Sequence, residues 1–247
     1  MLTLENLFAE PYASIVCYPR ARKMELRKRI GELRKLGVEG LDFVGEKRIL
    51  NVPVLGKGCV GIVVLTYGHC GRAALKIRRV DADRSRMQQE AKLLQRANSV
   101  GVGPKLLRFS RNFLLMEFIE GVLLIDWLKT KRSRILIRKV LREILEQCWS
   151  LDRIGLDHGE LSHAPKHVIV SKEDKPVIVD FESASLNRRP SNVTSICQFL
   201  FLGDEPAKIL AKKLGTVDRE TVFEALRRYK NDRTFENFET VLTAFGL

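Results

Sequence analysis

The chain has 247 residues, 45% apolar and 30% charged, a composition typical of globular proteins that excludes a wholly disordered chain. No uncharged stretch approaches the roughly 20 apolar residues of a membrane span, and the N-terminus lacks the basic head of a secretory signal. The five cysteines form no CxxC pair, so we expect neither a disulfide framework nor a zinc ribbon, and we expect a cytoplasmic location.

The formal net charge of +13 is concentrated in two segments. Residues 20–35 hold eight basic and two acidic side chains, and residues 129–142 hold seven basic and none acidic. A polyanion such as RNA or a ribonucleoprotein particle would match this charge. A basic surface that is merely solvated, and partly balanced by nucleotide phosphates, is the alternative. Because no RNA-reading aromatic pattern accompanies the charge, both interpretations stay open.

Hydrophobic periodicity predicts a β-rich front half and a helical back half. Strands are expected at 49–55, 62–65, 73–77, 106–109 and 113–118, and again at 168–170 and 177–180. Helices are expected at 19–36, 84–97, 134–151, 193–202, 205–214, 217–229 and 235–245. This order predicts an α+β fold with two lobes in series. The expected domains are a basic helical extension at 1–47, a five-stranded N-lobe at 48–119 and a helical C-lobe at 120–247.

A glycine-rich stretch with the spacing GxGxxG runs from Leu55 to Val63. In dinucleotide-binding folds the third glycine of this pattern opens a helix. Here the β-branched run 62–65 follows and predicts a hairpin, whose bare backbone can donate N–H groups to phosphates. The alternative is a plain hairpin whose glycines serve only its turns. The candidate phosphate-binding residues are Gly56, Lys57, Gly58, Cys59, Val60, Gly61 and Val63.

Lys76 lies on the return strand between apolar neighbours, where a buried ammonium group needs an anion. Glu90 follows on the next predicted helix. A lysine–glutamate pair of this kind holds the ammonium group where it can grip the α- and β-phosphates of a nucleotide. In this order, the glycine hairpin, Lys76 and Glu90 resemble the Gly-rich loop, strand lysine and helix glutamate of protein kinases.

The resemblance to protein kinases continues through residue 182. The stretch 114–121 is similar to the kinase hinge and implies that the backbone of Glu117 and Ile119 binds adenine. The stretch 158–162, which contains Glu160, is similar to the HGD or HRD loop. The stretch 178–182 is similar to the DFG turn, which implies that Asp180 holds Mg²⁺ or Mn²⁺ bound to ATP. The resemblance implies that Glu160 orients the nucleophile during phosphoryl transfer.

Three departures distinguish the chain from ordinary kinases. The position of the base carries Glu160 rather than aspartate, one methylene longer. The metal-binding asparagine is absent, and His167 stands nearby as a candidate ligand, although Mg²⁺ prefers oxygen. Lys166 is a candidate to neutralise charge near the γ-phosphate. Too few residues separate Glu182 from the helix expected at Asn192 for an activation segment.

The missing segment makes the chain resemble the Rio and KEOPS-complex families of atypical kinases, and most closely the archaeal predicted serine/threonine protein kinases. A zinc cluster of His158, His163 and His167 with Glu160 is a rival, but Pro165 and the spacings argue against one helical face. The expected function is an atypical serine/threonine protein kinase or ATPase. The alternatives are a small-molecule kinase of the aminoglycoside or choline type and a nucleotide-binding pseudokinase.

Overall fold

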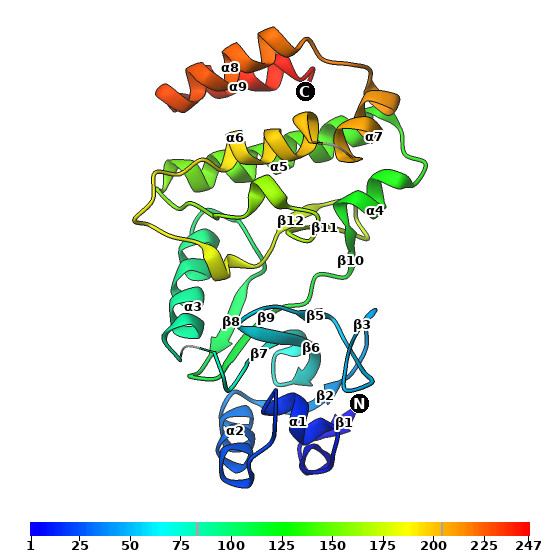
Figure 1. Cartoon of the computed structure of the whole chain (residues 1–247), viewed down its shortest axis with the longest axis vertical. Helices are drawn as coiled ribbons and strands as arrows, with labels where there is room; N and C mark the ends of the chain where they lie inside the picture. Colours follow the sequence, from blue (N-terminus) through cyan, green and yellow to red (C-terminus); the bar gives the residue numbers. More distant parts are fainter. Residues whose placement is uncertain (83, 204) are drawn as a thin grey trace. The chain divides into compact units, whose positions relative to one another are not determined.

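The computed structural model describes residues 1–82, 84–203 and 205–247, which form two compact units. The first unit comprises Met1–Gln95 and Pro104–Phe118, and the second comprises Arg96–Gly103 and Ile119–Leu247. Antiparallel strands dominate the first unit and helices the second, as Figure 1 shows. The predicted α+β class, with a β-rich front and a helical back, is confirmed.

The first unit is built on an antiparallel sheet of seven strands, in the order β1-β2-β6-β7-β9-β8, with β5 paired to β6. The strands are β1 (Leu2–Thr3), β2 (Val38–Asp42), β5 (Gly56–Lys57), β6 (Gly61–Gly68), β7 (Gly71–Arg78), β8 (Leu106–Phe109) and β9 (Phe113–Glu117). The sequence predicts five strands and a helical extension at 1–47 packed on, or ahead of, the N-lobe. Three strands of this sheet were not predicted: β5 lies just beyond the strand expected at 49–55, and β1 and β2 come from the N-terminal extension, whose backbone is therefore part of the sheet.

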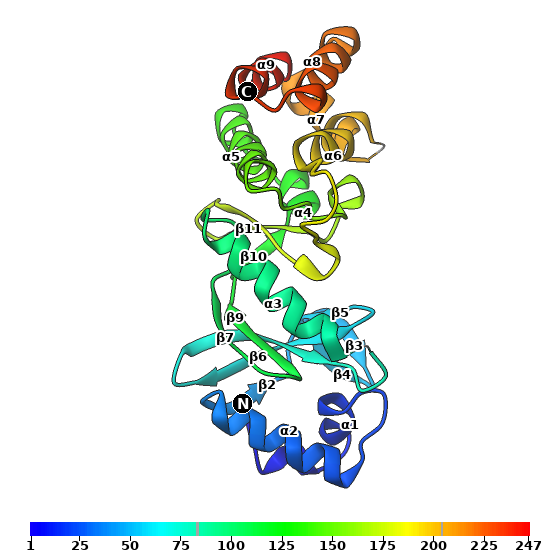
Figure 2. The same ribbon diagram turned by 90° about the vertical axis from the view of Figure 1, so that its left-hand side faces the viewer.

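Helices cover both faces of this sheet (Figure 2). The helices α1 (Tyr12–Val16) and α2 (Lys23–Lys35) share one hydrophobic core with the strands. Because side chains alternate along a strand, Leu75 and Ile77 join that core while Lys76 points to the opposite face. The helix α3 (Arg84–Asn98) lies on that opposite face. The alternation thus places the strand lysine toward the helix that carries Glu90.

The single strand predicted at 49–55 is wrong. The chain instead forms a hairpin of β3 (Lys47–Ile49) and β4 (Val52–Val54). Leu50 and Asn51 both have a positive φ, at 51° and 63°, which is the conformation of a tight two-residue turn. Leucine seldom adopts this conformation, so the sequence pattern predicted that an extended strand would continue through Leu50.

The second unit joins a three-stranded antiparallel sheet to a set of helices. The strands are β10 (Gly121–Leu123), β11 (Val168–Ser171) and β12 (Pro176–Ile178). The helices are α4 (Leu124–Lys129), α5 (Arg134–Arg153), α6 (Asn192–Cys197), α7 (Glu205–Leu214), α8 (Arg219–Asn231) and α9 (Phe235–Ala244). The helix α6 begins at Asn192 as predicted but continues as a π-helix over Gln198–Leu202. None of the helices in the described residues is long and apolar enough to cross a membrane.

Asp152, near the end of α5, organises this helical part. Its buried carboxylate accepts hydrogen bonds from the backbone N–H (2.9 Å) and side-chain amide (2.7 Å) of Asn192 and from the Tyr229 hydroxyl (2.9 Å). Burial raises the pKa of Asp152, which these donors partly counteract. These contacts tie the start of α6 and the last turn of α8 to α5, and so fix where the segment that follows Asp180 ends.

Candidate active site

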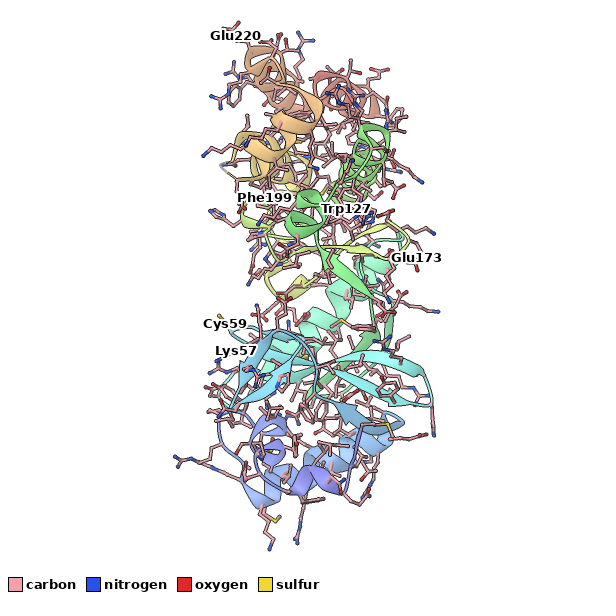
Figure 3. All side chains as sticks on the ribbon, turned by 90° about the vertical axis from the view of Figure 1, so that its right-hand side faces the viewer. Lys57, Cys59, Trp127, Glu173, Phe199 and Glu220 are labelled. Atoms are coloured by element: carbon pink, nitrogen blue, oxygen red, sulfur yellow. The ribbon has the colours of Figure 1, made fainter. Side chains whose placement is uncertain are left out.

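The glycine-rich stretch forms the β5–β6 hairpin of the first unit. Within it the Gly58 N–H donates to the Gly61 carbonyl at 2.8 Å. A side chain at Gly61 would begin 3.0 Å from both Cγ of Lys76 and the Ile77 carbonyl, so glycine avoids a tight contact with the strand lysine. Lys57 and Cys59, both labelled in Figure 3, are exposed. The remaining candidates line the same hairpin: Gly56 pairs with Val63, and Val60 is buried.

Lys76 and Glu90 form a buried ion pair in the first unit. The ammonium nitrogen lies 2.8 Å from Oε1 of Glu90, and the two side chains are 5% and 3% exposed. Burying two charges costs several kcal/mol that the contact must offset, so their placement calls for a reason beyond packing. The pair holds the ammonium group beside Gly61, next to the turn of the hairpin.

The predicted hinge residues occupy the boundary of the two units. Glu117 ends β9 in the first unit, where its N–H donates to the Lys105 carbonyl at 2.9 Å and its carboxylate accepts from the Lys105 N–H at 3.1 Å. Ile119 opens the second unit and is half-buried. Their proposed adenine contacts remain a prediction.

The loop that carries Glu160 is pinned to the segment after Asp180. Asp157 and Ser185 exchange two backbone hydrogen bonds, at 3.0 and 2.8 Å. Gly159 has a φ of +89°, and a side chain there would begin 2.8 Å from the Ser183 carbonyl. Glycine is therefore required for the two segments to approach each other this closely.

Both carboxylate oxygens of Glu160 have partners. The Ser183 hydroxyl donates to Oε1, while Oε2 lies 2.8 Å from Nε2 of His167. The second contact is close but lacks the alignment of a hydrogen bond. The Ser183 hydrogen bond, with smaller contributions from the charges of His167 and Lys166, lowers the pKa of Glu160. The extra methylene thus lets the carboxylate reach partners on two sides, and it stays ionised.

His167 and Asp180 lie side by side in the second unit, with Nδ1 and Oδ2 4.0 Å apart. Asp180 adopts a left-handed conformation, with φ 70°, which is uncommon outside glycine and concentrates at functional sites. The neighbouring imidazole of His158 is fully buried, and burial lowers its pKa to about 4, so that ring is neutral.

These two side chains fit a divalent cation. Ligands of one Mg²⁺ at 2.0–2.1 Å lie up to about 4.2 Å apart, which matches the spacing of His167 and Asp180. A histidine ligand commonly has a carboxylate near its second ring nitrogen, and Oε2 of Glu160 lies 2.8 Å from Nε2 of His167. No group of three or more His, Cys, Asp or Glu side chains in the described residues could enclose a metal by itself. Oxygens of a nucleotide would complete the set.

Sequence reasoning overlooked Ser183 and Arg188. The Arg188 guanidinium donates to the Asp157 carboxylate at 2.8 Å and to the Ser183 carbonyl at 2.5 Å. The two residues thereby join the Glu160 loop to the chain that follows Asp180. Only the position of Ser183, three residues after Asp180, marked it in the sequence. Lys166, by contrast, is exposed to solvent, and its positive charge helps to lower the pKa of Glu160.

These features define a kinase-like, two-lobed protein. The sheet unit contains the buried lysine–glutamate pair, and the helical unit contains the loops that carry Glu160 and Asp180. Residues 70–194, just over half of the chain, match the RIO domain family. The chain belongs to the RIO domain family, which comprises atypical protein kinases and ATPases that use ATP and a divalent metal. The match includes Lys76, Glu90, Glu160 and Asp180 but begins after the glycine hairpin.

An uncharacterised protein of the archaeon Methanocaldococcus jannaschii is 31% identical to this chain over 120 residues. The aligned part covers 47% of this chain and 98% of that protein. The predicted resemblance to Rio-type atypical kinases of archaea is thereby confirmed.

Proposed function

We propose that this chain is an ATP-dependent phosphotransferase that transfers the γ-phosphoryl group to a hydroxyl, as an atypical serine/threonine protein kinase or ATPase. The observation that carries the proposal is the buried ion pair of Lys76 and Glu90 beside the glycine hairpin. A buried ion pair adds little net stability to a fold, because desolvation of the two charges offsets their attraction. An ammonium group that binds phosphates, however, needs a fixed position.

The proposed roles divide between the units. In the first unit, Lys76 and the N–H groups of the hairpin bind phosphate oxygens, and the backbone of Glu117 and Ile119 binds adenine. In the second unit, Asp180 and His167 would hold Mg²⁺ or Mn²⁺. When bound, this ion supplies charge neutralisation on the phosphoryl oxygens.

Glu160 orients the attacking hydroxyl and accepts its proton as the new O–P bond forms. Its lowered pKa keeps it in the ionised form that this step requires. Lys166, exposed and close enough to act on Glu160, offsets negative charge near the transferred group. The new bond to phosphorus forms as the bond to the β,γ-bridging oxygen breaks, and ADP leaves.

The acceptor is a protein hydroxyl or a water molecule, and membership of the RIO family favours both over a small-molecule acceptor. One observation favours the pseudokinase alternative. Both carboxylate oxygens of Glu160 already have contacts, so an acceptor hydroxyl must displace the Ser183 hydroxyl from Oε1 or share Oε1 with it.

Incubation with γ-labelled ATP and Mg²⁺ or Mn²⁺ tests the proposal directly. Label on the chain itself or on an added protein indicates a kinase, and label in free phosphate indicates an ATPase. Choline and aminoglycosides are included as acceptors to test the small-molecule alternative. ATP binding without any transfer would identify a pseudokinase, and the absence of ATP binding at millimolar concentration would overturn the proposal.

We further propose an RNA or ribonucleoprotein partner for the exposed basic residues of α2. Arg22, Lys23, Arg27, Lys28 and Lys35 are exposed and, in the part of the chain that the structure describes, form no ion pairs. The segment 129–142 is less open, because Lys129, Arg132, Lys139 and Arg142 each pair with a carboxylate. All five cysteines are free thiols, which suits the cytoplasm that we propose as the location.

A further inference from the structure

An aromatic side chain of the N-terminal segment reaches the glycine-rich hairpin. Tyr18, between α1 and α2, has its ring centroid 5.4 Å from Nζ of Lys57 and 5.1 Å from Cζ of Arg79. Lys57 stands between the first two glycines of the hairpin, and Arg79 follows the end of β7. One ring therefore contacts two cations within the distance at which a cation is attracted to an aromatic face.

Backbone hydrogen bonds fix the ring relative to both strands. The Tyr18 carbonyl accepts from the Val80 N–H at 2.8 Å, and the Val60 carbonyl accepts from the Arg79 N–H at 2.8 Å. The first bond ties the N-terminal segment to the end of β7, and the second ties the end of β7 to the hairpin. The position of the Tyr18 ring beside the hairpin is thus set by the main chain as well as by the ring contacts.

The two cations differ in how they are neutralised. Arg79 donates two hydrogen bonds to Asp81, at 2.9 and 2.7 Å, and these raise the pKa of the guanidinium. Lys57 is exposed, and no carboxylate of the described residues pairs with it. Among the described residues, the Tyr18 ring is thus the group that contacts the Lys57 ammonium, and the positive charge of Lys57 remains available to an anion. An exposed lysine without such a partner samples many rotamers.

We propose that Tyr18 is a positioning residue for the phosphate-binding hairpin. The Tyr18 ring holds the ammonium group of Lys57 in place, so that Lys57 can bind the phosphates of a nucleotide. This inference rests on the proposed nucleotide binding and extends the site into the segment before the hairpin, which lies outside the RIO match. It implies that Tyr18 affects binding of the phosphates and leaves binding of adenosine unchanged.

Calorimetric titration with a non-hydrolysable ATP analogue and with adenosine, both with Mg²⁺, tests the inference. Tyr18→Leu is expected to weaken binding of the analogue about 2- to 5-fold, the equivalent of an exposed cation–π contact, while adenosine binding stays unchanged. Tyr18→Phe keeps the aromatic face and is expected to bind as the wild type does. The matched control is Tyr12→Leu, because Tyr12 lies in the same segment and core but pairs with Phe43 at 5.0 Å.

A double-mutant cycle with Lys57→Met completes the experiment. In the Tyr18→Leu background the lysine substitution is expected to have a smaller effect than in the wild type, because its positioning is already lost. If Tyr18→Leu does not fold, fluorinated phenylalanines at position 18 preserve shape while they withdraw electron density from the ring. Binding of the analogue should then weaken stepwise with fluorination.

Three results overturn the inference: equal weakening of analogue and adenosine binding, additive effects of the Tyr18 and Lys57 substitutions, or analogue binding that is insensitive to ring fluorination. Failure of the wild type to bind the analogue is a separate result that removes the proposed function itself.

Discussion

Oε2 of Glu160 lies 2.8 Å from Nε2 of His167, so the carboxylate proposed as the base touches the imidazole proposed as a metal ligand. In the sequence the two residues represent separate departures from the kinase pattern, a longer acid and a missing asparagine. In the structure the two side chains are in contact, because the glutamate reaches the histidine. Any substitution of one residue therefore alters the surroundings of the other.

Glu160→Gln is expected to retain binding of ATP and to lose phosphoryl transfer on the order of 10²–10⁴-fold, because an amide cannot accept the proton. Steady-state turnover with labelled ATP, beside calorimetric binding, provides the measurement. Glu160→Asp is the matched comparison, since it keeps the charge but shortens the reach. Turnover of Glu160→Gln equal to that of the wild type would make the residue structural and the chain a pseudokinase.

Ser183→Ala is expected to raise the pKa of Glu160, because the hydrogen bond that chiefly lowers it is removed. The base must be ionised to act, so the acid limb of the turnover profile should move to higher pH. The profile of turnover against pH measures this shift. Ser162→Ala is the control, since the Ser162 hydroxyl contacts His163 rather than Glu160. An unchanged acid limb in Ser183→Ala would exclude the proposed hydrogen bond from the working enzyme.

Lys76→Ala is expected to lower the free energy of unfolding by about 3–5 kcal/mol, because it leaves the Glu90 carboxylate buried without its ammonium partner. The double variant Lys76→Met/Glu90→Gln should recover part of this loss, and neither variant should gain stability from ATP as the wild type does. Denaturant unfolding with and without ATP measures both effects. Lys172→Ala breaks an exposed pair with Glu120 of similar length, 2.7 Å, and should change stability by less than about 1 kcal/mol. A loss equally small for Lys76→Ala would contradict the buried pair.

Asp180→Asn is expected to abolish turnover and to remove the dependence of ATP binding on Mg²⁺, because a carboxylate ligand becomes a neutral amide. Titrations with Mg²⁺ and with a chelator give the measurement. Asp174→Asn is a close control, since Asp174 also has a left-handed backbone, with φ 57°, in a turn away from the site. Asparagine tolerates this conformation, so neither variant should lose its backbone geometry. A Mg²⁺ dependence preserved in Asp180→Asn would exclude Asp180 as a ligand.

Charge reversal at Arg27 and Lys28 of α2 is expected to weaken RNA binding, whose affinity should fall steeply with salt because neutralised phosphates release counterions. Reversal at Arg142 is a poor test, because its guanidinium donates to the Leu247 carbonyl at 3.0 Å and lies near Glu239. The control is charge reversal at Arg227 and Lys230, which are exposed on α8, because it changes the net charge by the same amount away from α2. Equal binding by the two reversed proteins, or binding insensitive to salt, would leave the basic face of α2 as solvated charge.

Local patterns in the sequence were sufficient for the order of the functional elements. Glycines before a β-branched run indicate a hairpin, and alternation on β7 sends Lys76 to the face opposite Leu75. The start of α6 at Asn192 and the short segment before it were also predicted from the sequence. These features rest on backbone propensities and side-chain periods that act over a few residues.

The tertiary structure alone decided how distant residues meet. The strand β2 joins β6, Arg29 is fully buried with its guanidinium 2.6 Å from the Arg78 carbonyl, and Ser183 contacts Glu160 across 23 positions. Each of these contacts joins groups that are far apart in the chain, and many other groups of the same chemical type could have formed the same hydrogen bonds. Sequence periodicity tells which face a side chain occupies, but only the packed fold determines which polar group lies opposite it, and here that choice sets the surroundings of both Glu160 and Lys57.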